Sequence, residues 1–276
     1  FTVTDTSDFY SDDPSLWESS KSGDSTYVPM NTGNNQSLLF KLRFNLIKGI
    51  RFSLLNSTSN DTWFGYDHAF KYNPDGRSGA YKETAYSAFQ LNHMITPKLF
   101  YELKLSYMDN YTGNYLYKNP FDHIIADTAG IYHGNFYDIG DTVYSYVHDK
   151  HLENYGSGFF TGGQSKNHSM LTMIDRTIKL DLTWQANHHH SIKLGVLGIA
   201  HEVDHQGRTI RNKYDGETNQ NDLYEPEVFG DSTVYADIYK VKPQEVAAYF
   251  QDKMEFNEMV INFGVRYDYF DPASKY

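Results

Sequence analysis

The chain has 276 residues, no cysteine and a formal net charge of −11, which excludes nucleic acid as an expected partner because phosphate binding needs a basic surface. No apolar run reaches the roughly eighteen residues that a transmembrane helix needs. The 24 Tyr and 18 Phe nevertheless accompany a mean hydropathy of −0.62, a combination typical of strands that alternate between an apolar and a wet surface.

Residues 1–36 are rich in Ser, Thr, Asp, Asn and Gly and show no periodicity, which predicts an irregular entry segment or loop. Beyond them, apolar and polar residues alternate in pairs of runs joined by short turns, the pattern of antiparallel hairpins. The four hairpins are predicted at about 38–56, 84–108, 174–200 and 244–270, and long polar loops near 57–82, 110–166 and 205–240.

The last hairpin has the clearest pattern. From Met259 to Tyr269 every second residue is apolar or aromatic, whereas Asn262, Arg266 and Asp268 lie on the opposite side. Each run is about ten residues long, whereas ordinary strands have about five to six and a transmembrane β-strand needs about nine to eleven. The pattern therefore predicts strands with lipid on one side and water on the other.

The connections alternate between short and long along the whole chain. Outer-membrane barrels have short periplasmic turns and long extracellular loops. We therefore expect the turns near Lys48, Pro97, His189 and Asn257 to be periplasmic, and the three long loops to face outward.

Two segments of the last hairpin carry a family resemblance. The run from Ala248 to Lys253, followed by the run from Asn262 to Pro272, resembles a "YxQD" strand and an "NxGxRYDxF.P" strand of TonB-dependent outer-membrane receptors. The resemblance covers some thirty residues and implies a barrel of about twenty-two strands with a plug in its lumen. It also implies capture of a scarce nutrient by the outer loops and import powered by a periplasmic TonB-type energy transducer.

The predicted fold class is therefore all-β: part of a transmembrane antiparallel β-barrel, about eight strands of a larger one, spanning 37–276. A free-standing sheet with two unpaired edges would be a liability, so we expect the chain to be roughly the first third of that barrel. The family's plug domain and coupling box are not recognised in it.

Charged residues alternate with the apolar ones and are expected to face the lumen. They have both signs, and cross-strand ion pairs that also grip a plug are the favoured interpretation, with a substrate path as the alternative. The principal members are Arg43, Lys104, Asp181, Lys253, Glu255, Arg266 and Asp268.

Aromatic residues of the predicted outer loops could stack on a ligand or pack the loops against each other. They are Trp63, Tyr66, Tyr115, Tyr117 and Tyr137. No metal site is predicted, since adjacent residues such as His188 to His190 cannot easily converge on one ion and the histidines of 110–166 match no ligand spacing.

The predicted function is nutrient uptake across the bacterial outer membrane, with an iron chelate, a cofactor, a glycan or a peptide as the cargo. Membrane lipid, the plug and the transducer are the expected partners, and a surface lipoprotein is a further candidate. A passive porin or assembly-associated barrel, and a soluble all-β binding protein, remain as alternatives. No cofactor is expected, and no catalytic constellation suggests an enzyme.

Overall fold

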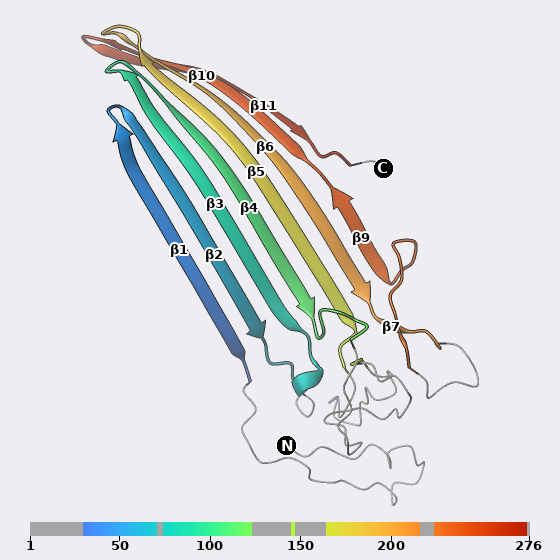
Figure 1. The fold of residues 1–276 in the computed structure, drawn as a ribbon. Coiled ribbons are helices and arrows are strands. Elements are labelled where there is room, and N and C mark those ends of the chain that lie inside the picture. Colours follow the sequence, from blue (N-terminus) through green and yellow to red (C-terminus); the bar gives the residue numbers. More distant parts are fainter. Residues whose placement is uncertain (1–29, 71–73, 123–144, 147–163, 216–223, 275–276) are drawn as a thin grey trace, which may run out of the picture.

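The computed structural model describes residues 30–70, 74–122, 145–146, 164–215 and 224–274 and is all-β, as predicted (Figure 1). The strands are β1 (Thr32–Ile47), β2 (Ile50–Phe64), β3 (Gly79–Thr96), β4 (Leu99–Tyr115), β5 (Asn167–Gln185), β6 (His190–Thr209), β7 (Arg211–Asn212), β8 (Pro226–Glu227), β9 (Ala236–Val241), β10 (Gln244–Phe256) and β11 (Met259–Asp271). A single 3-10 turn lies at Pro74–Gly76, and no helix among these residues is long and apolar enough to cross a membrane.

The long strands form one antiparallel sheet in the order β1-β2-β3-β4-β5-β6-β10-β11. Each strand pairs with its neighbour in sequence, the short turns lie at one end, and the sheet is not closed (Figure 1). Consecutive antiparallel strands with tight turns need no crossover, so the hydrophobic alternation and the turn residues are enough to set this topology.

β9 and β10 are two halves of one strand against β6. Val241 pairs with Val203 and Gln244 pairs with Ala200, so the register continues unchanged through the gap. Pro243 interrupts the ladder because proline has no N–H to donate, although its carbonyl still accepts a bond of 2.9 Å from the N–H of His201.

The strands extend further than the sequence predicts. β1 begins at Thr32, inside the predicted entry segment, and β2 and β4 run on into the predicted loops at 57–82 and 110–166. The predicted 205–240 loop contains the end of β6 and all of β9 except Val241. Those predicted boundaries were wrong because backbone pairing continues where both faces of the sheet are polar. Where both faces are polar, hydrophobic and polar residues do not alternate, so the sequence carries no periodic signal for a strand.

The register determines which side chains share a face. Leu103 pairs with Leu91 and Leu180, and the same row continues through Val196 to Tyr267. We call the face that holds this row the apolar face. Among the described residues only neighbouring strands touch one another, so no second layer covers this face.

Large side chains on the apolar face are accordingly exposed. Phe263 is 58% exposed, Val265 61% and Tyr267 67%, values that are foreign to the interior of a water-soluble domain. The structure therefore has no core under the sheet in the part of the chain that it describes.

The buried side chains gather instead at the end of the sheet where the long connections lie. We call this group the loop-end core; its central residues are Tyr115, Tyr117, Tyr146, His168 and Ile210. The ring of Tyr115 stacks between those of Tyr81 and His168, with centroids 4.6 and 5.2 Å away. The Tyr117 and Tyr146 rings meet edge to face at 5.0 Å.

Polar atoms inside the loop-end core find partners across long stretches of sequence. The Gln164 amide donates to the Ser145 carbonyl at 2.9 Å and to the Tyr117 hydroxyl at 3.3 Å. Burial raises the pKa of Tyr146 to about 12 and also raises the pKa of Tyr117, because the charged phenolate is poorly solvated there.

The loop-end core is expected to loosen in alkali. The Tyr146 pKa is 10.0 when the residue is unfolded and about 12 when folded, so its contribution to stability is complete below pH 10 and is lost as the pH rises toward 12. Tyrosinate absorbance should show a late-titrating fraction that coincides with new protease cleavage near residue 146. In Tyr146→Phe that late fraction should shrink; an unchanged titration would contradict the assignment.

A close contact on the opposite face ties three strands together. The Tyr249 ring on β10 crosses Gly195 of β6, and its hydroxyl donates to Asp181 of β5 at 2.8 Å. A Cβ on Gly195 would lie 2.0 Å from the Tyr249 ring and 2.7 Å from the Asp181 carboxylate. Only glycine leaves room for this bridge.

Gly195→Ala is therefore expected to displace the Tyr249 ring and lower stability by about 1–3 kcal/mol, the usual cost of overpacking. Gly230→Ala is the matched control, since a Cβ there meets nothing within 4 Å. Thermal unfolding in detergent measures both. Equal melting temperatures for the two variants would rule out the bridge.

Candidate functional site

The face opposite the apolar face carries most of the predicted lumen charges, and we call it the charged face. One row contains Arg43, Lys104, Lys179 and Asp268, with Lys104 directly opposite Lys179. The next row joins Glu102, Asp181 and Arg266. Lys253 and Glu255 share the same face nearer the turn. The seven predicted residues are thus brought onto one surface.

The lysine and arginine ion pairs on the charged face run along strands rather than across them. Lys179 reaches Asp181 at 2.8 Å, and Arg266 grips Asp268 with Nη2 at 2.8 Å. Lys253 pairs with Glu255 in the same way. Such exposed pairs are worth roughly 0–1 kcal/mol each, so they position charge on the surface more than they stabilise it.

A shallow pocket opens near the end of the sheet opposite the short turns, and we call it the rim pocket. Three aromatic residues line it, Trp63, Tyr66 and Phe70, and the first two are among the five that the sequence singled out. Polar groups complete the lining: Asp67, Arg77, Ser78, Asn114, Ser165 and Asn167. Aromatic surfaces beside amides and a carboxylate suit a ligand with both apolar and hydroxyl-bearing faces.

Glycines and an arginine hold the rim pocket in shape. A Cβ on Gly33 would lie 2.8 Å from the Trp63 ring, so that ring lies flat against β1 while the side chain stays 52% exposed. Arg77 donates to the Gly65 carbonyl and, at 3.3 Å, to the Met30 carbonyl. The Trp63 surface is therefore fixed before any ligand arrives, which lowers the ordering cost of binding.

The other predicted aromatics lie elsewhere. Tyr115 is the last residue of β4, and it and Tyr117 belong to the loop-end core, so they pack the connections rather than line the pocket. Trp63 is also in a strand, β2, contrary to its expected place in a loop. Tyr137 lies outside the described residues.

Histidines of the sheet pair with nearby carboxylates. His201 contacts Asp175 at 2.6 Å and Glu245 at 3.5 Å, and His190 contacts Asp252 at 2.7 Å. Within the described ranges no group of three or more potential ligands is gathered for a metal ion.

Two charged positions escaped the sequence reading. Asp252, in the "YxQD" segment, lies on the apolar face beside Ile192, and Arg176 interrupts the run from Ile174 to Trp184. A signal was present in both cases, namely a charge at an otherwise apolar position of the alternation. Arg176 pairs with Ala200, near the end of the apolar stretch of β6, whereas Asp252 stands within the apolar face between Ile192 and Phe263 and contacts His190.

The comparisons with known proteins add no identification. No protein-family model matches the chain, and a search of curated proteins returned no match.

Proposed function

We propose that this sheet is part of the wall of a transmembrane β-barrel in the bacterial outer membrane, and that the barrel is a TonB-dependent nutrient receptor. The observation that carries the membrane part is an apolar strip along one face of the sheet, interrupted at Asp252, which pairs with His190. The hairpin resemblance carries the receptor part.

We call this strip the apolar band. On the apolar face it covers Leu99–Tyr107 of β4, Ile192–Ala200 of β6 and Ile261–Tyr269 of β11. Each stretch is about nine residues long, the length of a transmembrane strand. Each is followed two residues later by a carboxylate on the same face: Asp109, Glu202 and Asp271. A bilayer edge accounts for an end that recurs on separate strands.

The turns supply an independent estimate of strand tilt. One cross-strand row joins Ile50, Tyr101, Leu194 and Val265, with His93, Leu182 and Phe250 between them. Counted along the chain, the turn residues Gly49, Lys98, His189 and Glu258 lie one, three, five and seven positions away from this row. The stagger is therefore about one residue per strand.

If the turns lie at one membrane surface, this stagger sets the strand tilt. A rise of about 3.3 Å per strand spacing of about 4.8 Å gives a tilt of about 35°, within the range of membrane barrels. At that tilt nine residues cover about 24 Å, which matches the apolar height of about 25 Å of such barrels. Tyr107 and Tyr269 then lie at the outer interface, where aromatic girdles are found.

The open edges also favour a larger barrel. β1 and β11 pair on one side only among the described residues, and β11 is exposed along its whole length. Unpaired backbone groups in hydrocarbon cost several kcal/mol each, so further strands must complete the ring. The charged face would then line the lumen, and the rim pocket would open toward the outside, where cargo is captured.

Neighbouring residues on β6 give a direct test. Val196 lies in the apolar band and is 53% exposed, whereas Leu197 lies on the charged face. Val196→Arg should cost about 2–4 kcal/mol at mid-bilayer depth and reduce assembly into the outer membrane, while Leu197→Arg is tolerated. Outer-membrane fractionation and heat-modifiable migration on gels measure assembly. A soluble protein would tolerate Val196→Arg, because an arginine on a water-exposed face has no desolvation cost.

Energy coupling separates a receptor from a passive porin. Site-specific crosslinking in the intact protein, in cells carrying a TonB-type transducer, should yield a crosslinked pair whose amount rises when cargo is present. A porin that assembles normally in the same cells and gives no such pair would refute the receptor while leaving the barrel intact.

A further inference from the structure

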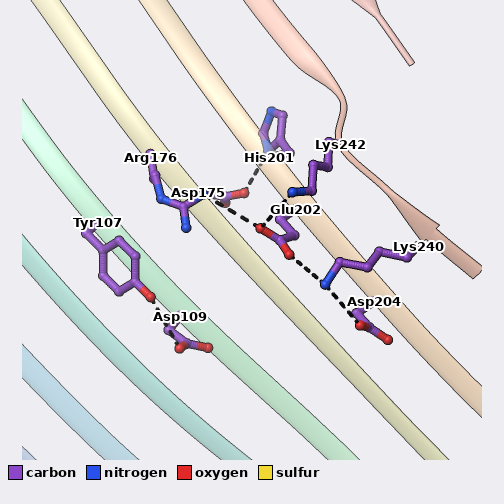
Figure 2. Close-up of polar contacts among 9 residues, drawn as sticks. All are labelled: Tyr107, Asp109, Asp175, Arg176, His201, Glu202, Asp204, Lys240 and Lys242. Atoms are coloured by element: carbon purple, nitrogen blue, oxygen red, sulfur yellow. Dashed lines mark hydrogen bonds and ion pairs between the residues drawn. The ribbon is translucent and has the colours of Figure 1, made fainter. Parts of the chain in front are cut away.

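A cluster of ionic side chains stands on the apolar face at the outer end of the apolar band (Figure 2). Glu202 of β6 lies at its centre, with Lys240 at 2.7 Å and Arg176 and Lys242 each at 3.9 Å. Lys240 also reaches Asp204 at 3.4 Å. Three cations from β5 and from the strand that contains β9 thus converge on one carboxylate. We call these five residues the interface cluster.

The position of the interface cluster is fixed by register. Glu202 comes two residues after Ala200, the last residue of the apolar band on β6, and Lys242 lies opposite it beside the Pro243 interruption. Arg176 pairs with Ala200 and lies 5.9 Å from the Tyr107 ring, at the same level. His201 and Asp175, also drawn in Figure 2, point to the charged face and take no part in this surface.

Exposure divides the interface cluster into an inner and an outer layer. The Glu202 side chain is 18% exposed and that of Asp204 is 30% exposed. The side chains of Lys240, Arg176 and Lys242 are 53%, 54% and 66% exposed. The carboxylates therefore lie beneath the cations and hold them, while the cations retain unused N–H donors toward the surroundings.

We propose that the interface cluster binds the phosphorylated headgroup of an anionic lipid in the outer leaflet. The inference rests on the proposed membrane position, which places these cations at headgroup depth with hydrocarbon directly below. Each lysine or arginine near a membrane surface strengthens binding to anionic lipid about fivefold. Within the interface cluster itself, three cations and two carboxylates sum to a net charge of +1, which a phosphate can neutralise.

The competing interpretation is a closed ion-pair network that serves only the sheet. The two interpretations predict different effects on lipid binding when the Glu202 charge is removed. If the ion pairs serve only to stabilise the sheet, substituting either Glu202 or the lysines weakens the network. If it is a phosphate site, loss of the Glu202 charge makes the surface more positive, so lipid binding is retained or strengthened, whereas loss of the lysines weakens it.

The experiment uses the intact protein in detergent and two probes with identical acyl chains, bis-phosphorylated lipid A and its dephosphorylated form. Native mass spectrometry measures the lipid bound per protein. The variants are Lys240→Gln/Lys242→Gln and Glu202→Gln. Lys48→Gln/Lys98→Gln is the control, because it removes the same charge from two short turns at the other end of the sheet.

The wild type should prefer the phosphorylated lipid, and the Lys240→Gln/Lys242→Gln protein should bind it about thirtyfold more weakly. The control variant should match the wild type, and Glu202→Gln should bind at least as well. Equal binding of both lipids, or equal loss in Glu202→Gln and the double lysine variant, would overturn the proposal.

Two further outcomes distinguish failure of the lipid site from failure of the proposed function. Displacement of the lipid by millimolar inorganic phosphate alone would reduce the site to one for free anions and overturn the lipid assignment. Failure of the wild type to assemble in the outer membrane would refute the proposed function itself. Normal assembly without lipid preference refutes only this inference.

Discussion

The structure depends on an antiparallel hydrogen-bond ladder that continues in register through eight strand positions. The ladder provides hydrogen bonds for the backbone N–H and C=O groups of every interior strand without side-chain partners. The side chains can therefore be apolar on one face and charged on the other. A sheet with one apolar and one charged face suits an apolar environment on one side and water on the other better than water on both. In water alone the apolar face would stay bare, since no described element covers it.

Alternation and turn chemistry were sufficient to predict an all-β chain, the antiparallel pairing of consecutive long strands and the four short turns. They were not sufficient to predict strand ends. Beyond Leu54, for example, β2 continues through Ser57, Asn60 and Thr62, which are polar on both faces and carry no periodic signal. β9 was missed because a proline separates it from β10, and proline ordinarily marks the end of a strand.

The candidate sites were predicted unevenly. The charged face follows directly from period two, so its seven principal residues lie together as expected. The positions of the aromatic residues cannot be predicted from the two-residue period, because packing among loops depends on contacts between residues far apart in sequence. Trp63 and Tyr66 share the rim pocket, whereas Tyr115 and Tyr117 are taken up by the loop-end core. The interface cluster was not predicted, because Arg176 stands alone between Ile174 and Ile178 and its partner Glu202 lies on another strand.

The stagger of the short turns has a consequence for permeability. A ring built at a tilt of about 35° from about twenty-two strands would measure about 40 Å between opposite backbones. Such an opening would let antibiotics and small proteins diffuse into the cell, so the ring could not be left vacant. Whatever sealed the proposed barrel would have to be polar and would rest against the charged face. The mixed charges around Lys104 and Asp181 would then hold a plug as well as line a lumen.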